Sequence, residues 1–241
     1  MSLPRLLQPA DIETGAREIE RIRAEYARRK RDISKTFYSW DRVSNCFTHN
    51  QLVRDCIAEL TRGKMFPLEN RSVADIGCGS GTWLLEFAQW EASDLHGIDL
   101  DESRIERAKA RFPSAKLHVG DARHLPWQNS SFDLVSQFTL FSSILSGTVK
   151  KQIAREMWRI VKPGGVILWF DLRVNNPRNK SVRGISSSEI HSLFPDGSIR
   201  LRRVTLAPPL ARRIVPISWI AASLLEKIPV LRTHYLGIIR K

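Results

Sequence analysis

The pattern of hydrophobic and polar positions along the chain changes near residue 71. Before that point apolar residues recur every three or four positions, the spacing of one face of an α-helix. Residues 10–35 predict a charged surface helix with one apolar stripe, made of Ile12, Ile19, Ile22 and Tyr26. Residues 47–63 predict a second helix, which Gly63 stops and whose apolar face is Leu52, Val53, Cys56, Ile57 and Leu60.

From Arg71 onward, short apolar runs alternate with amphipathic stretches. The runs are "SVADIG", "DLHGIDL", "KLHVG", "FDLVSQF" and "GVILWFDL". Helical patterns at residues 82–91, 102–111 and 148–161 separate most of them. Such alternation is typical of a parallel sheet with helices on both faces. The sequence therefore predicts an N-terminal helical cap over residues 1–70 and an α/β domain over residues 71–241.

The C-terminal segment predicts two further strands, "SIRLRRVTLA" and "THYLGIIRK". Between them, "VPISWIAASLLEKIPV" has the pattern of a helix bounded by prolines. We expect the apolar run 214–225 to pack on the sheet. The alternative is a helix on a membrane surface, because Arg212 and Arg213 precede the run.

Composition narrows the class of protein. A chain of 241 residues with 42% hydrophobic residues can bury a full core. It contains no apolar stretch of 18 residues and no signal-peptide pattern, so we expect a cytoplasmic protein without an integral membrane segment. Its three cysteines lack metal-ligand spacing, which predicts reduced thiols and no metal site.

The charge balance indicates the kind of partner. With 38 Lys and Arg against 25 Asp and Glu, the formal net charge is +13. A basic chain favours anionic partners, which include nucleic acid, a membrane surface and a phosphorylated substrate. Charge does not choose among these three.

Candidate chemistry begins at "VADIGCGSGTWLLEF", residues 73–87, where a predicted strand ends in Gly77, Gly79 and Gly81 and a helix follows. Such a turn lets the backbone and the helix amides approach a ligand. A dinucleotide-binding turn would need a small residue at position 82, where Thr82 stands. The turn is therefore suited to a different nucleoside.

Three aspartates stand at the ends of the first three predicted strands: Asp75, Asp99 and Asp121. Ligands of such sheets bind beyond these ends. Asp99 follows Gly77 by 22 residues, which suits a contact with a ribose diol. Three carboxylates around one cleft of a basic protein favour a ligand rich in donors and positive charge, such as a sulfonium nucleoside that carries an ammonium group.

These residues resemble the class I S-adenosylmethionine-dependent methyltransferases. The resemblance spans residues 71–171, where "ADIGCGSG", "GIDLD", "GDARHLP", "FDLV" and "VKPGG" match the family's motifs in order. It implies S-adenosylmethionine as cofactor and a Rossmann-like mixed sheet of seven strands in the order 3-2-1-4-5-7-6, with the last strand antiparallel.

The resemblance also implies roles for single residues. Asp75 would face the methionine end, Gly77 and Gly79 would make room for it, and Asp99 would accept from both ribose hydroxyls. The remaining residues expected at the cofactor are Leu100 and Ala122 beside the adenine, Asp121 at its amine and Gln137 at the sulfonium. The aromatic residues Trp83, Phe87 and Trp90 are expected in the core.

The acceptor is less defined. The fourth strand ends in "SQFTLFSS". It lacks the Asn/Asp-Pro-Pro-aromatic motif that resembling enzymes use to methylate amino groups, so amino-group methylation of nucleic acid is disfavoured. We expect O-methylation of a small molecule, a glycan or a lipid-linked acceptor. The alternatives are an RNA methyltransferase and a binding subunit that has the fold without catalysis.

Two segments are expected to line the acceptor pocket, residues 35–42 and 171–190. Their polar and aromatic residues predict substrate contacts by Tyr38, Arg173, Asn176 and Arg183. His124 and His191 have no visible partner in the sequence. The catalytic base is therefore not assigned.

Overall fold

The computed structural model describes residues 9–32, 42–177 and 179–241. Two helices precede the first strand, α1 (Pro9–Asp32) and α2 (Val43–Arg62), and Gly63 ends α2. Both helices predicted from the apolar spacing are thus confirmed. Tyr38 lies outside the described residues.

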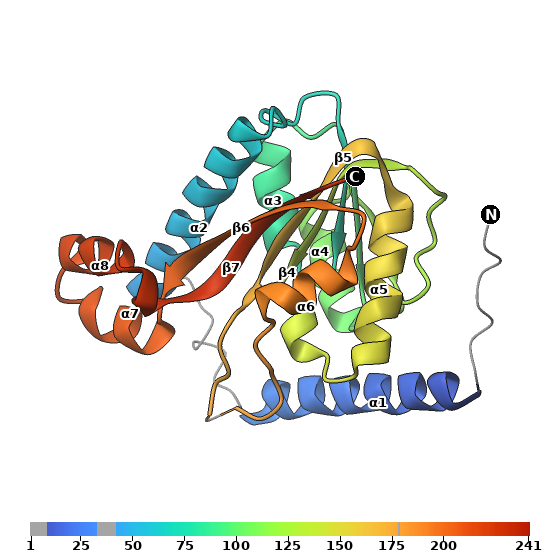
Figure 1. Cartoon of the computed structure of the whole chain (residues 1–241), viewed down its shortest axis with the longest axis horizontal. Helices are drawn as coiled ribbons and strands as arrows, with labels where there is room; N and C mark the ends of the chain where they lie inside the picture. The colour runs from blue at the N-terminus through green and yellow to red at the C-terminus, as the bar shows by residue number, and fades with distance from the viewer. Residues whose placement is uncertain (1–8, 33–41, 178) are drawn as a thin grey trace.

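The sheet has seven strands in the order β3-β2-β1-β4-β5-β7-β6 (Figure 1). The pairs from β3 to β5 are parallel, and β7 runs antiparallel to both β5 and β6. The predicted fold class and strand order are confirmed. The strands are β1 (Ser72–Ile76), β2 (Asp94–Asp99), β3 (Lys116–Val119), β4 (Phe132–Phe138), β5 (Val161–Leu172), β6 (Ser198–Leu206) and β7 (Arg232–Arg240).

Helices cover both faces of the sheet, as the alternating pattern predicts. One face buries apolar side chains of α2 and α3, among them Leu60 and Phe87, against β1, β4 and β5. The other face buries Val149 and Met157 of α5 against the same central strands. The helices after β1 are α3 (Thr82–Gln89), α4 (Glu102–Arg111), α5 (Gly147–Ile160), α6 (Ser187–Leu193), α7 (Pro208–Ile214) and α8 (Trp219–Glu226).

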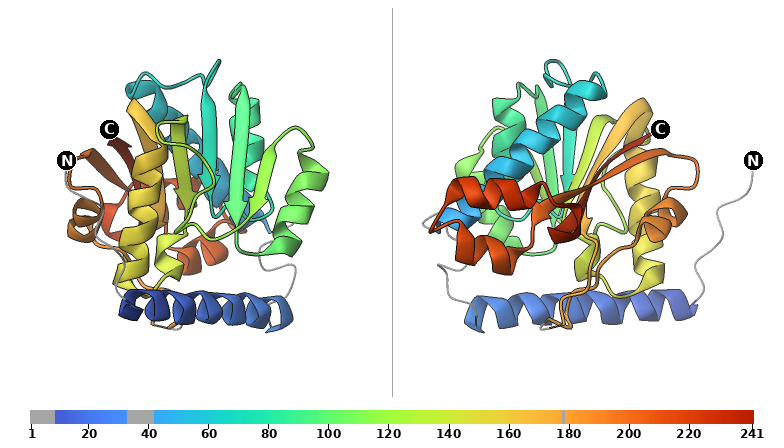
Figure 2. Two further views of the ribbon diagram at one scale, coloured as in Figure 1. Left: turned by 90° about the vertical axis from the view of Figure 1, so that its right-hand side faces the viewer. Right: turned by 60° about the vertical axis from the view of Figure 1, so that its left-hand side comes forward.

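Helix α1 lies across the edge where the parallel strands end (Figure 2). The Glu18 carboxylate accepts hydrogen bonds from the amides of Leu145 (2.6 Å) and Ser146 (3.4 Å), and Arg21 donates to the carbonyl of Ser143 (2.6 Å). Burial opposes the charge of Glu18, but the bonds from Arg21 and these amides outweigh it and lower its pKa. Specific polar contacts therefore hold α1 on the loop after β4.

The C-terminal apolar run contains the expected helix as α8, which is shorter than the sequence pattern predicts. The first residue of the run, Ile214, is the last residue of α7, and Pro216 lies in the turn between α7 and α8. Val215 and Ala222 are buried in a cluster with Leu206 of β6, so one side of the pair does pack on the sheet. The other side faces solvent, and Ile220 is 74% exposed.

No helix within the described part of the chain is long and apolar enough to cross a membrane. The division into a cap over residues 1–70 and a domain over residues 71–241 stays a prediction. The structure shows that α2 shares a buried cluster with the sheet, through Leu52, Cys56 and Leu60.

Candidate active site

The glycine turn follows β1 and holds a shape that requires glycine. Gly77, Gly79 and Gly81 have φ of +76°, +55° and +82°, in the left-handed region that side chains disfavour. The amide of Gly77 donates to the carbonyl of Ile98 (2.8 Å), which ties the turn to β2. The amide of Gly79 donates to the Asp99 carboxylate (2.9 Å). The turn and the strand-end aspartate therefore form one unit.

Two carboxylates at this turn, those of Asp75 and Asp99, are buried. Asp75 is 2% exposed and accepts a hydrogen bond from the Ser136 hydroxyl (2.7 Å), and burial raises its pKa to about 7. Burial also raises the pKa of Asp99, although the amides of Asp101 and Gly79 oppose the shift. Neither carboxylate forms an ion pair with the described residues. A ligand that brings hydroxyls or positive charge would compensate their burial.

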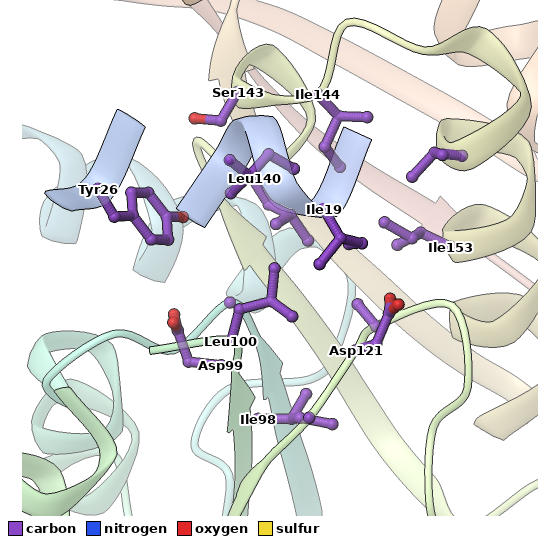
Figure 3. Close-up of a pocket in the computed structure, with 15 residues that line it drawn as sticks. Ile19, Tyr26, Ile98, Asp99, Leu100, Asp121, Leu140, Ser143, Ile144 and Ile153 are labelled. Atoms are coloured by element: carbon purple, nitrogen blue, oxygen red, sulfur yellow. The ribbon is translucent and has the colours of Figure 1, made fainter. Parts of the chain in front are cut away.

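A pocket lies between these strand ends and α1. Figure 3 shows Asp99 and Asp121 on two sides of Leu100, with Ile19 and Tyr26 of α1 across the opening from them. The rest of the wall is mostly apolar: Ile22, Ile98, Ala122, Leu140, Ile144, Val149 and Ile153. The pocket therefore combines apolar surfaces for a flat ring with carboxylates at its sides.

These acceptor and apolar groups fit an adenosine. Each Asp99 oxygen accepts one backbone amide, from Gly79 or Asp101 (both 2.9 Å), and a carboxylate oxygen has a second lone pair for a ribose hydroxyl. Asp121 pairs with Arg123 (2.7 Å), and it still lines the pocket. Leu100 and Ala122 supply the apolar contact that an adenine ring needs.

The structure gathers most of the predicted cofactor residues in one place. Five line the pocket: Gly77, Asp99, Leu100, Asp121 and Ala122. Asp75 and Gly79 adjoin it through the glycine turn. Gln137 is fully buried and does not line the pocket; its amide donates to the Phe170 carbonyl (3.3 Å) and accepts from the Leu140 amide (3.0 Å). Its contact with the sulfonium stays a prediction.

A second cavity lies at the same edge of the sheet, between α2, α3 and α7. The cavity has a volume of about 290 Å³ and opens to solvent. Its wall includes Ser44, Asn45, Thr48, His49, Leu52, Trp83, Phe170, Thr205, Pro208, Ala211, Arg212 and His234. The end of β4 lies near both walls: Leu140, two residues after the strand, lines the first, and Phe138 stacks on Trp83 of the second (3.7 Å between ring centroids).

His49, in the wall of this second cavity, pairs with a glutamate of α3. His49 Nε2 is 2.7 Å from the Glu86 carboxylate, and both side chains are mostly buried. In the tautomer that donates the Nε2 proton to Glu86, a neutral imidazole has its basic lone pair on Nδ1. The pair thus has the composition of a proton acceptor with a supporting carboxylate.

His234 belongs to the same cavity but has a different environment. Its ring stacks on Phe170, with 4.7 Å between centroids, and burial lowers its pKa to about 4. At neutral pH this imidazole is uncharged and only weakly basic. His234 is therefore a poor proton acceptor, and His49 is the histidine of this cavity that pairs with a carboxylate.

The predicted substrate residues that the structure describes line neither cavity. Arg173 donates to the carbonyl of Arg232 (2.8 Å), and Arg183 pairs with Glu189 (2.9 Å), which also pairs with the buried Lys150. Asn176 lies in the same loop, where its carbonyl accepts from the Asn179 amide (3.0 Å). The substrate roles of Tyr38, Arg173, Asn176 and Arg183 remain predictions.

Sequence reasoning did not select the α2 and α7 residues of the second cavity. His49 and Glu86 are 37 positions apart and belong to two different helices, so no motif joins them. It also placed Trp83 in the core. Trp83 does pack against the core cluster, but it also lines the cavity.

The fold and the first pocket define a Rossmann-like protein that binds a nucleoside, and comparison with known proteins makes the class specific. Residues 73–165 match the family model of a methyltransferase domain. A demethylmenaquinone methyltransferase of Listeria welshimeri is 30% identical over 107 residues, 42% of this chain and 44% of that protein. The biotin biosynthesis bifunctional protein BioHC of Teredinibacter turnerae is 28% identical over 189 residues, 72% of this chain and 32% of that protein.

Among solved structures, phosphoethanolamine N-methyltransferase 1 of Haemonchus contortus superposes with a TM-score of 0.59 and 18% identity, over 92% of this chain and 49% of that one. These matches support the class I S-adenosylmethionine-dependent methyltransferase family that the motifs predict. The cofactor that this family implies is S-adenosylmethionine. The chain spans less than half the length of the two curated relatives described above.

Proposed function

We propose that this protein methylates a hydroxyl group of an acceptor that enters the cavity between α2, α3 and α7. The observation that carries the proposal is that His49, in the wall of this cavity, pairs with Glu86. The cavity adjoins the pocket of Asp99 and Asp121 through the end of β4, so an acceptor and a cofactor would meet there. The acceptor classes are those expected from the sequence: a small molecule, a glycan or a lipid-linked molecule.

Bound S-adenosylmethionine supplies an electrophilic methyl group. A neutral hydroxyl is a weak nucleophile, and a base that takes its proton during attack speeds the reaction. In this proposal His49 would accept that proton. Glu86 keeps the imidazole in the required tautomer and stabilises the imidazolium that forms.

The other walls of the cavity would position the acceptor. Trp83 and Phe170 give one side an apolar surface, and the nearly parallel stack of Trp83 on Phe138 (6° between planes) fixes it. Arg212 adds a positive charge to the wall. This combination favours an acceptor with an apolar portion and a polar or anionic portion.

Two other functions remain candidates. An RNA methyltransferase would use the net charge of +13 along a phosphate backbone. A binding subunit would keep the cofactor pocket without transferring a methyl group. The His49–Glu86 pair favours a catalytic protein over a binding subunit. The partly apolar cavity favours a smaller acceptor over RNA.

The proposal is tested by incubating the protein and its His49→Gln variant with methyl-tritiated S-adenosylmethionine and separate fractions of lipid, glycan, small metabolites and RNA. We expect the parent to label a fraction other than RNA, as a methyl ether, and the variant to label it far less. Label in RNA alone would favour the RNA methyltransferase. Cofactor binding without label in any fraction would favour the binding subunit.

A further inference from the structure

The exposed apolar side chains of this protein gather on one element. Eight large apolar side chains are exposed among the described residues, and six of them fall within residues 217–230. Ile217 is 86% exposed, Ile220 74% and Val230 77%. The others are Trp219, Leu224 and Ile228. Clustering of this kind on an otherwise polar surface marks an interaction site.

The cluster belongs to the α7–α8 hairpin, defined here as residues 208–231. In Figure 1 the hairpin lies at one end of the molecule, beside the start of α2. Ile220 and Leu224 are four residues apart in α8 and share one helix face. The opposite face buries Ala222 against the cluster around Leu206. The hairpin therefore has a packed side and an unpartnered apolar side.

Cations flank the apolar side. Arg212, Arg213 and Lys227 are all exposed, whereas Glu226 is the one acid in the sequence of the hairpin and is 6% exposed. Apolar side chains bordered by arginine and lysine match the interface of a bilayer that carries anionic headgroups. The apolar groups would enter the acyl boundary, and the cations would meet the headgroups.

We propose that the α7–α8 hairpin docks this protein onto an anionic membrane surface. A second copy of the chain is a poorer occupant, because each copy carries a net charge of +13 and would bring its own arginines to the same patch. An uncharged bilayer would offer no counter-charge to the exposed Arg213 and Lys227. The anionic bilayer satisfies both the apolar and the charged part of the surface.

The docking surface bears on the substrate, and this step rests on the proposed function. Pro208, Ala211 and Arg212 of the hairpin also line the acceptor cavity. A hairpin seated on a bilayer would hold that cavity next to the headgroup layer. Within the proposed acceptor classes, an acceptor carried by a lipid is then the one best placed to enter.

The test is vesicle flotation of the full chain with phosphatidylcholine alone and with phosphatidylcholine mixed with phosphatidylglycerol. We expect the protein to float with the anionic vesicles, to stay behind with phosphatidylcholine alone and to release as salt rises. The double variant Ile220→Glu/Leu224→Glu should lower the partition coefficient by about tenfold or more, which corresponds to about 1.4 kcal/mol. Arg213→Glu should lower it as well.

Val119→Glu is the matched control, because Val119 is 49% exposed on β3, at the other edge of the sheet. It should float like the parent. Thermal unfolding of each variant checks that it folds. The proposal is overturned if the parent ignores anionic vesicles, or if the double variant floats as the parent does.

Sedimentation of the parent tests the alternative that a second copy of the chain covers the α7–α8 hairpin. A concentration-dependent dimer that Ile220→Glu/Leu224→Glu abolishes, together with no flotation, would overturn membrane docking in favour of self-association. Flotation requires no methyl transfer, so its failure leaves the proposed O-methylation intact. Failure of the labelling experiment likewise leaves the docking result unchanged.

Discussion

The two cavities lie at the same edge of the sheet, but they are assembled differently. The cofactor pocket takes its polar groups from successive strand ends between Asp75 and Asp121. The acceptor cavity takes its wall from helices and strands between Ser44 and His234. The first arrangement leaves a motif in the sequence, and the second does not. Cofactor binding is thus a property of the local chain, whereas acceptor binding depends on the whole fold.

Because the two cavities are assembled from different parts of the chain, a substitution in one should leave the function of the other intact. The largest effect is expected from a substitution in the acceptor cavity. Replacing His49 with Gln removes the proposed base, and loss of general base catalysis should lower kcat by about a hundredfold or more. Cofactor affinity should remain within about twofold, because His49 does not line the cofactor pocket. Steady-state kinetics and calorimetry measure the two quantities.

His191 provides a control for this change, since it is exposed on α6 and bonds the Ser187 carbonyl (2.8 Å). His191→Gln should keep the parent's kcat. A His49→Gln variant with undiminished kcat would show that another group takes the proton or that none is needed.

The next largest effect concerns the cofactor. Asp99→Ala should weaken S-adenosylmethionine binding by about a hundredfold, because two hydrogen bonds of about 1.5 kcal/mol each are lost. Asp94 stands at the other end of the same strand, where it pairs with Lys116, so Asp94→Ala is the matched control and should bind like the parent. Equal affinities of Asp99→Ala and the parent would remove Asp99 from the binding site.

A smaller effect is expected from pH. The pKa of buried Asp75 is raised to about 7 from 3.8, so the folded protein keeps a proton that the unfolded chain loses. This group therefore supports folding fully below about pH 4, and its contribution is lost as pH rises toward 7.

A cationic methionine end favours the ionised form of Asp75. Cofactor affinity should therefore increase as pH rises through 7, by at most about tenfold per unit. Calorimetry from pH 6 to 8 measures this slope, and Asp75→Asn should flatten it. A slope that persists in Asp75→Asn would assign the titration to another group.

The smallest effect concerns the helix that covers the cofactor pocket. Glu18→Ala removes the carboxylate that binds the amides of Leu145 and Ser146. The lost bonds should weaken the packing of α1 over the pocket by about 1 kcal/mol, which should raise the dissociation rate constant of the cofactor about fivefold. Glu20 is exposed on the same helix, so Glu20→Ala should release the cofactor at the parent's rate in stopped-flow measurements. Equal rates in both variants would mean that α1 does not retain the cofactor.

Much of the fold follows from local sequence pattern. The two N-terminal helices, the five parallel strands and the α3, α4 and α5 helices occur where apolar spacing predicts them. The C-terminal hairpin is the exception, because spacing alone does not tell which side of an apolar run finds a partner. Pro216 divides that run, and only the sheet surface decides that Ala222 is buried while Ile220 is exposed.

The candidate site divides in the same way. Asp99 and Asp121 could be selected because strand ends meet at one edge of a parallel sheet, which a sequence reveals. His49 could not, because its partner Glu86 and its neighbour Arg212 reach it only through tertiary packing. Arg173 and Arg183 show the converse, since a cationic loop in the sequence finds its hydrogen-bond partners within the chain.

The central claim is that one cofactor would span from the Asp99 pocket to the cavity of His49. A crystal structure of the complex with S-adenosylhomocysteine tests it most directly. We expect the ribose hydroxyls at the Asp99 carboxylate and the adenine between Leu100 and Ala122. We expect the sulfur at the end of β4, directed toward the His49 cavity. A ribose bound away from Asp99, or a sulfur directed away from that cavity, would contradict it.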